Sequence, residues 1–241
     1  MSHATPSAAT EFCELIGVTT RWGRYLAQKE NGIIVRGLDI AGAPGKAVDL
    51  GCGGGRWSKV LADRGWGMTC VDIDENSLRS CQQKIPSATC IRVAPTDTRI
   101  PCTDKSLELV LCMEAPDVIE RDWFAPEARR VLKDGGYVIG FYMNRHSWRG
   151  MAWDPARSVN GSVEKYYTGP AYRDWKRTFR TQGFAMLHEE SYAWPPFGRT
   201  SDSPLIPLAT TIERMLGLKH LIRFAPWILF VAQKREERAG V

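Results

Sequence analysis

The hydrophobic positions of this chain follow two alternating spacings from residue 46 onward. Short apolar runs bounded by glycine, proline or polar residues predict buried strands, and apolar residues three and four positions apart predict amphipathic helices. The predicted strands cover residues 47–50, 68–71, 90–93, 107–112, 137–141, 184–192 and 227–232. The predicted helices cover residues 57–62, 74–85, 124–132, 172–181 and 207–216. Together they predict an α/β fold with a seven-stranded, mostly parallel sheet and helices on both faces.

Composition narrows the class of protein. Hydrophobic residues make up 44% and charged residues 24% of the 241 positions, which excludes a disordered or collagen-like chain. No apolar run approaches the roughly 20 residues of a spanning helix, so we expect no integral membrane protein. Residues 1–20 lack the basic start and apolar centre of a secretory signal, which predicts a cytoplasmic location.

Cysteine usage agrees with a reducing compartment. The seven cysteines are odd in number, lie far apart in the sequence and form no CxxC pair. This pattern predicts neither a disulfide framework nor a zinc site, and we expect no bound metal.

Charge is distributed unevenly along the chain. The formal net charge is +5, with −1 in residues 1–140 and +6 in residues 141–241, where five of the nine tryptophans also lie. A solvated basic surface over an aromatic core explains this pattern most simply. Recognition of an anionic partner is the alternative.

A glycine-rich turn is the strongest local signal. The segment Val48–Arg56 reads as a strand that turns through glycines into a helix, which lets a ligand approach bare backbone. Asp72 follows the second predicted strand, 21 residues after Gly51, where a carboxylate can accept hydrogen bonds from ribose hydroxyls. Asp74 is better suited to cap the next helix. A dinucleotide site would require a third glycine at the position of Arg56, so this spacing disfavours NAD.

At these residues the chain resembles the class I S-adenosylmethionine-dependent methyltransferases. Val48–Gly55 resembles their first motif and Val71–Asp74 their second. Three more segments match in the expected order, namely Thr96–Thr98, Ser106–Val110 and Glu127–Gly136. The resemblance covers residues 22–142 and implies a Rossmann-like fold, a methyltransferase activity and S-adenosylmethionine as cofactor.

The resemblance also implies roles for individual residues. Arg24 or Arg56 could meet the methionine carboxylate of the cofactor, although a surface arginine is the simpler interpretation of each. The residues expected at the cofactor are Asp49, Gly51, Gly53, Gly55, Asp72, Ile73, Asp97, Thr98 and Met113. Two departures from the family pattern, Thr-Asp-Thr at 96–98 and Leu-Glu at 107–108, keep the acid in each case.

The methyl acceptor is predicted less directly. Met113–Pro116 does not match the Asn/Asp-Pro-Pro-Tyr/Phe run of exocyclic-amine nucleic-acid methyltransferases, and the similar letters at Trp194–Phe197 lie too far downstream. The nucleophilic cysteine of cytosine-C5 methyltransferases follows the fourth strand. Pro101–Cys102 precedes that strand and therefore does not match. We therefore expect no DNA substrate. The small-molecule branch of quinone, natural-product and sugar methyltransferases is the closest resemblance.

That branch places substrate residues after the fourth and fifth strands and between the sixth and seventh. Here these segments are residues 114–120, 144–153 and 194–206. The candidate general bases are His146 and Glu114, with His188 as a further candidate. The predicted acceptor is a small molecule methylated on oxygen or nitrogen, with an anionic or lipid-linked acceptor left open. A catalytically inactive binding protein that acts through a partner, or an RNA methyltransferase, is the alternative.

The domain organisation follows from these assignments. We expect a single domain over residues 1–241, with the cofactor-binding core at 22–142, pocket insertions and a cover helix at 143–223, and the last strand at 224–233. The apolar series from Leu205 to Ile222 predicts a helix that faces the core. A lid or a membrane-surface element is the alternative, because Arg214, Lys219 and Arg223 are interspersed.

Overall fold

One seven-stranded sheet organises the computed structural model, which describes residues 19–152 and 169–236. The strand order is β3-β2-β1-β4-β5-β7-β6, and β7 alone runs antiparallel to its neighbours. The strands are β1 (Lys46–Leu50), β2 (Gly67–Asp72), β3 (Thr89–Arg92), β4 (Leu107–Cys112), β5 (Leu132–Met143), β6 (Phe184–Tyr192) and β7 (Trp227–Lys234). The predicted fold class is therefore confirmed.

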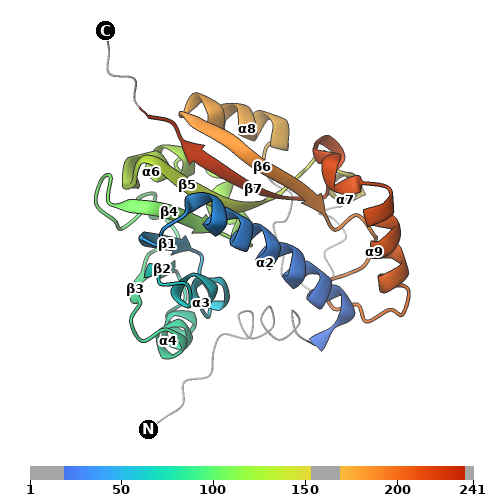
Figure 1. Ribbon diagram of the computed structural model, residues 1–241, viewed down its shortest axis with the longest axis horizontal. Coiled ribbons are helices and arrows are strands. Elements are labelled where there is room, and N and C mark those ends of the chain that lie inside the picture. The colour runs from blue at the N-terminus through green and yellow to red at the C-terminus, as the bar shows by residue number, and fades with distance from the viewer. Residues whose placement is uncertain (1–18, 153–168, 237–241) are drawn as a thin grey trace.

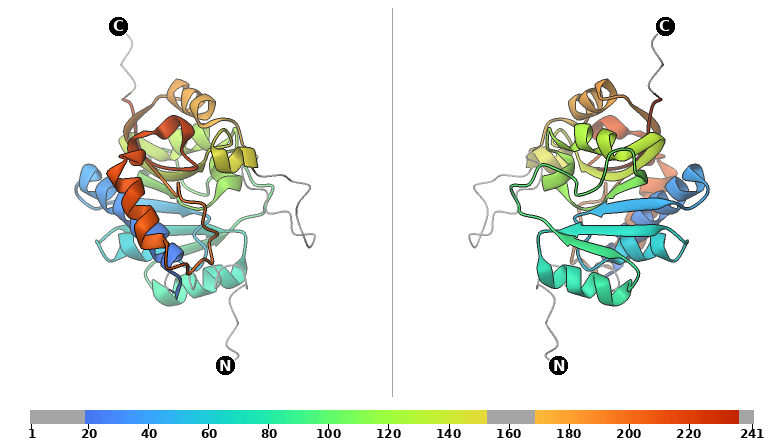
Figure 2. Two further views of the ribbon diagram at one scale, coloured as in Figure 1. Left: turned by 90° about the vertical axis from the view of Figure 1, so that its right-hand side faces the viewer. Right: turned by 90° about the vertical axis from the view of Figure 1, so that its left-hand side faces the viewer.

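Helices cover both faces of this sheet, as Figures 1 and 2 show. On one face, α2 (Arg21–Ala41), α3 (Arg56–Ala62) and α4 (Glu75–Lys84) pack on one buried cluster. On the other face, α5 (Pro116–Ile119), α6 (Phe124–Val131) and α8 (Tyr172–Thr181) pack on a second. Two further helices, α7 (Trp148–Ala152) and α9 (Ile206–Met215), and two 3-10 turns, η2 (Leu218–His220) and η3 (Ile222–Phe224), complete the described elements.

The sequence pattern did not predict helix α2. Its N-cap is Thr20, whose hydroxyl accepts a hydrogen bond from the Gly23 amide at 3.0 Å. Two interruptions in its apolar stripe hide the periodicity. Glu30 is buried at a stripe position, and Gly37 lies so close to Ile139 of β5 that no Cβ would fit between them.

Strand β5 begins earlier than predicted. The sequence predicts a turn at residues 135–136 after the preceding helix, but these residues belong to a strand that starts at Leu132. Gly135 keeps a positive φ of 79°, and the pairing of β5 with β4 shifts register near this end. The irregular segment expected at 143–165 contains α7, and its residues 153–165 lie outside the described part of the chain.

Helix α9 is expected from its sequence to face the core, and the structure corrects this expectation. Only Ile206 and Glu213 of the helix are buried. Met215, for example, is 78% exposed, and other apolar residues in and beside the helix are also open to solvent. The exposed residues are Leu205, Leu208, Ile212, Met215, Leu216, Leu221 and Phe224, which we call the α9 apolar surface. Figure 2 shows α9 beside α2.

Within the described ranges, no helix is both long and apolar enough to cross a bilayer.

Candidate functional site

The carboxyl ends of the parallel strands meet at one edge of the sheet, which is where ligands bind in open α/β sheets. The loop from Gly51 to Gly55 leaves β1 at this edge and leads into α3. Gly51, Gly53 and Gly55 have φ values of 72°, 51° and 81°, a region that other residues enter only with strain. The sequence prediction of a glycine turn between strand and helix is confirmed.

Close packing also requires glycine in this loop. A Cβ on Gly51 would lie 2.7 Å from the Cβ of Ala115, just after β4. The Gly51 amide donates to the Val71 carbonyl at 2.8 Å, so the loop is also fixed to β2. The loop therefore has a defined position relative to the ends of β2 and β4.

Asp72 ends β2 and points its carboxylate at the glycine loop. Its Oδ2 accepts a hydrogen bond from the Gly53 amide at 2.8 Å, and its Oδ1 accepts one from the Asp74 amide at 2.9 Å. Each carboxylate oxygen can accept a second bond, and the residue is only half-buried. Asp72 is thus held beside the loop with acceptor capacity left over, and its role at a ribose stays a prediction. Asp74 caps α4 as predicted, because its Oδ2 accepts from the Ser77 amide at 3.0 Å.

The other residues predicted at the cofactor lie around the ends of β2, β3 and β4. Ile73 is 52% exposed next to Asp72. Asp97 and Thr98 are exposed in the loop after β3, where Asp97 Oδ2 accepts from the Ala94 amide at 2.8 Å. Met113 is buried directly after β4. Their roles at a cofactor stay predictions.

Asp49 lies deeper than its neighbours in the predicted set. Its side chain is in the interface between β1 and α3, where Ser58 Oγ donates to its Oδ2 at 2.6 Å. The residue is 2% exposed, and burial raises the pKa of its carboxyl to about 8. The structure therefore gives Asp49 a contact with helix α3, and its role at the cofactor stays a prediction.

Glu114, one of the predicted bases, follows β4 at the same edge. It has a positive φ of 54°, which is strained for a residue with a side chain. Its Oε1 pairs with the Arg199 guanidinium at 2.7 Å, and both side chains are mostly shielded from solvent. This ion pair connects the end of β4 to the segment 193–205, which follows β6.

Glu30 of α2 adds a second carboxyl to this edge. It is 1% exposed, and the Tyr192 hydroxyl donates to its Oε1 at 3.0 Å. Burial raises the pKa of Glu30 to about 8; the charge of Glu114 adds to this effect, and Arg56 and Arg199 oppose it. Two carboxyls, two guanidiniums and a tyrosine from α2, α3 and the ends of β4 and β6 therefore interact here.

The raised pKa of Glu30 predicts that stability depends on pH. Between its ordinary pKa of 4.5 and about 8, the folded chain holds a proton that the unfolded chain releases, so stability falls as pH rises. Glu30→Gln should remove this dependence, which amounts to about 1.4 kcal/mol for each pH unit within that interval. Denaturant unfolding at pH 5.5 and 8.5 checks this. An equal loss of stability with pH in the variant and the parent would contradict it.

Segment 193–205 is attached to the start of α2. The Tyr25 hydroxyl lies 2.7 Å from Glu213 Oε1 of α9 and accepts from the Ala193 amide at 3.2 Å. The Trp22 amide donates to the Ser201 carbonyl at 3.2 Å. The segment therefore runs between α2 and α9, beside the charged cluster.

Arg149 of α7 also holds this segment. Its guanidinium donates to the carbonyls of Ala193 and Phe197 at 3.0 Å each, and to that of Pro195. Arg149→Ala should lower the free energy of unfolding by about 2 kcal/mol or more, because charged donors are lost from backbone acceptors. Arg145→Ala, at an exposed neighbour, is the control and should change little. Equal effects measured by urea unfolding would refute this role.

The two candidate histidines have different surroundings. His146 is exposed and lines a pocket with residues that include Arg173 and Phe224, where none of the predicted cofactor residues lies. His188 lies in the middle of β6, 3.8 Å from Glu190, and burial lowers its pKa. Glu114 follows β4, which pairs with β1, the strand before the loop.

Several residues of this edge were not found from the sequence. Glu30 belongs to a helix that was not predicted, and Tyr192 lies 162 positions away from it. Local spacing carries no signal for such a contact. Arg199 stands out in the sequence only as one of several basic residues, and its ion pair depends on the path of segment 193–205.

Comparison with known proteins agrees with this geometry. The family model described as "Methyltransferase domain" matches residues 48–140, which contain the glycine loop, Asp72 and Glu114. A curated ubiquinone biosynthesis O-methyltransferase of Idiomarina loihiensis is 30% identical over 112 residues. That match covers 43% of this chain and 45% of the relative, so it spans less than half of either protein.

Solved structures share the fold over most of the chain. An S-adenosylmethionine-dependent methyltransferase of Listeria monocytogenes aligns with a TM-score of 0.62 at 18% identity, covering 87% of this chain and 98% of the other. One of Thermotoga maritima aligns with a TM-score of 0.62 at 15% identity, covering 94% and 95%. The methyltransferase match at residues 48–140 agrees with the predicted family resemblance, and the solved structures show that the fold extends over most of the chain.

Proposed function

Residues 48–140 are a methyltransferase domain of the S-adenosylmethionine-dependent class, and from this premise we propose that the chain methylates an oxygen or nitrogen of a small molecule. One observation supports this proposal best. The Gly53 amide donates to Asp72 Oδ2 at 2.8 Å, beside a glycine loop at the carboxyl edge of a parallel sheet. Acidic and aromatic residues of α2, β6 and the end of β4 surround the adjacent space.

The reaction is an in-line displacement. Asp72 and the glycine loop would hold S-adenosylmethionine, which when bound would supply the activated methyl group that the acceptor lone pair takes up, with S-adenosylhomocysteine as the leaving group. A hydroxyl or amine acceptor also loses a proton to a base. The chain supplies alignment, which is worth several kcal/mol in well-oriented reactions. Two bases were predicted. Glu114 follows β4, the strand that pairs with β1, whereas His146 lines a separate pocket.

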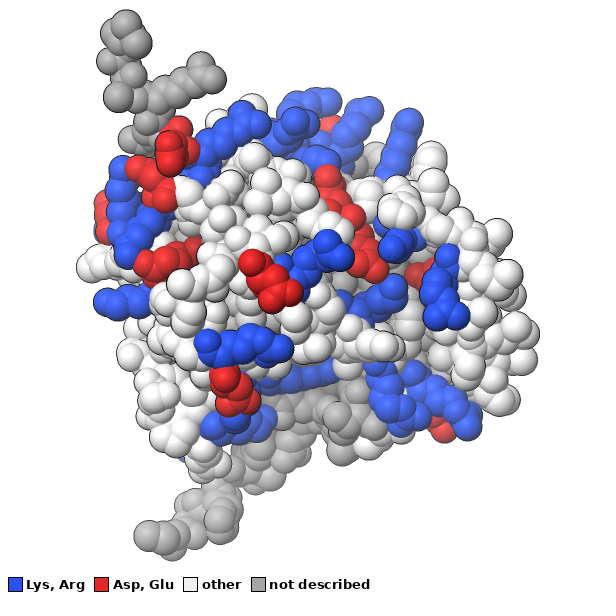
Figure 3. Space-filling model, in the orientation of Figure 1, with Lys and Arg blue, Asp and Glu red and all other residues white. Residues whose placement is uncertain are grey.

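An acceptor with a hydrocarbon part suits the α9 apolar surface. Tyr25 links α9 to α2 through Glu213, so this surface adjoins the segment that carries Arg199. Figure 3 shows that, on one face of the molecule, the side where α9 lies is largely uncharged, whereas basic side chains gather over α8. The curated relative, matched over less than half of its length, is named for ubiquinone biosynthesis. We therefore favour a lipid-linked acceptor over a purely anionic one.

The activity is tested by incubating the full chain with methyl-labelled S-adenosylmethionine and fractionated metabolite extracts. We expect label in an organic-soluble fraction, together with S-adenosylhomocysteine. Calorimetric binding of the cofactor without transfer to any fraction would instead favour a binding protein without catalysis. Label in RNA alone would overturn the small-molecule assignment.

The role of the α9 apolar surface has its own test. Leu208→Glu and Met215→Glu should raise the KM for a hydrocarbon-bearing acceptor at least about 10-fold, since burying each side chain is worth roughly 1.5–3 kcal/mol. Both residues are exposed, so folding should be unchanged. The same acceptor without its hydrocarbon tail is the matched control. Equal KM changes for both acceptors would show that α9 does not contact the tail.

A further inference from the structure

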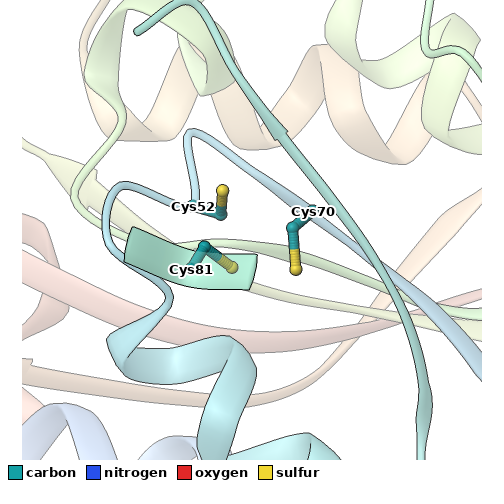
Figure 4. A group of neighbouring side chains, drawn as sticks. All are labelled: Cys52, Cys70 and Cys81. Carbon is teal, nitrogen blue, oxygen red and sulfur yellow. The ribbon is translucent and has the colours of Figure 1, made fainter. Parts of the chain in front are cut away.

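Three cysteines that are distant in sequence converge beside the glycine loop. Cys52 lies in the loop, Cys70 in β2 and Cys81 in α4. Their sulfur atoms all lie within 4.8 Å of one another. Figure 4 shows the three side chains grouped between these elements. The sequence alone gives no sign of this group, because a zinc site is expected from CxxC spacing and here the fold brings the thiols together.

The group is enclosed and made of soft donors. Cys52 is 8% exposed, and Cys70 and Cys81 are fully buried. Cys90 of β3 is the register partner of Cys70, and its thiol is half-buried. Cys90 therefore lies on the strand next to Cys70, outside the group of three sulfurs.

The polar groups beside the thiols already have partners. Cys52 Sγ can donate to the Gly53 carbonyl oxygen at 3.5 Å. The neighbouring acid, Asp49, is hydrogen-bonded to Ser58 and needs no metal to satisfy it. Among the described residues, these three cysteines form a group whose sulfur atoms all lie within 4.8 Å of one another.

The spacing fits a tetrahedral thiolate centre. Zn²⁺ binds thiolates at about 2.3 Å, which places sulfurs about 3.8 Å apart in a tetrahedron. A separation of at most 4.8 Å is within about 1 Å of this value. Each thiol that becomes a ligand releases one proton to solvent.

We propose that Cys52, Cys70 and Cys81 bind one Zn²⁺ ion through their thiolates. The ion ties the glycine loop to β2 and α4. Because Cys52 lies between Gly51 and Gly53, the same centre fixes the loop that approaches the cofactor. No residue of the proposed transfer reaction is used as a ligand, so the site stands or falls independently of that function.

The experiment uses the full chain, reduced and freed of metal, without cofactor. Cd²⁺, and Co²⁺ in parallel, are titrated while the thiolate-to-metal charge-transfer absorption is recorded. We expect one ion per chain, displaced by Zn²⁺. Failure of the parent protein to bind Cd²⁺ at equimolar concentration overturns the proposal without any variant.

Variants then assign the ligands. Since loss of an outer-shell partner costs a metal site about 10- to 100-fold in affinity, Cys52→Ser or Cys81→Ser should cost at least about 100-fold. Cys112→Ser is the matched control, because Cys112 is a buried cysteine in the cluster on the opposite face of the sheet. Circular dichroism verifies folding of each variant. Unchanged Cd²⁺ affinity in folded Cys81→Ser, or an equal loss in Cys112→Ser, refutes the assignment.

Discussion

Asp72→Ala should lower the affinity for S-adenosylmethionine by about 10- to 100-fold. The carboxylate is held in place by the Gly53 and Asp74 amides, so little entropy is lost when it accepts ribose hydroxyls. Hydrogen bonds to a charged group contribute about 1.5–3 kcal/mol, which gives this range. Isothermal titration calorimetry with the purified variant measures the effect.

The control separates binding from folding. Asp63→Ala removes an exposed carboxylate that pairs with Lys59 of α3, and it should leave cofactor affinity unchanged. Asp72→Ala also removes acceptors from two amides, so urea unfolding must accompany the calorimetry. Cofactor affinity equal to that of the parent, in a folded Asp72→Ala protein, would show that another group holds the ribose.

The sheet could be predicted because its strands carry their own boundaries. β4 (Leu107–Cys112) and β6 (Phe184–Tyr192) have the predicted limits, since each is an apolar or alternating run that ends where the pattern changes. The glycine loop could be predicted for a similar local reason. Its three positive φ values are a property of consecutive residues and need no information from distant parts of the chain.

The failures have one physical cause, which is that burial depends on partners that a local pattern does not contain. Glu30 interrupts an apolar stripe because Tyr192 of β6 satisfies it, and this concealed helix α2. In α9 the periodicity was real, but nothing in it showed that α2 would contact the helix through Tyr25 and leave Met215 exposed.

The same limit separates the two parts of the candidate site. Gly51 and Asp72 lie at the ends of β1 and β2, which are neighbours both in the sequence and in the sheet, so a motif could identify them. The pair of Glu114 and Arg199 and the convergence of three cysteines depend on how loops and helices pack over the finished sheet. Such contacts depend on the tertiary structure, and no spacing of residues along the chain predicts them.

Gly51→Ala should reduce both stability and cofactor binding, and a second substitution, at Ala115, should restore part of the loss. At φ 72° an alanine costs about 1–2 kcal/mol, and its Cβ would also meet the Ala115 Cβ at 2.7 Å. The loop or the end of β4 must move, which displaces amides next to Asp72. We expect a loss of at least about 1–2 kcal/mol of unfolding free energy and at least a 10-fold loss of cofactor affinity.

The double variant Gly51→Ala with Ala115→Gly removes the steric part and retains the backbone strain. It should therefore recover part of the binding, while the cost of the positive φ persists. Gly32→Ala in α2 is the matched control, because a Cβ there meets nothing within 4 Å and should stabilise the helix by up to about 1 kcal/mol. Calorimetry and urea unfolding of the four proteins give both quantities. If the double variant binds no better than Gly51→Ala, then contact between the loop and the end of β4 does not set the shape of the cofactor site.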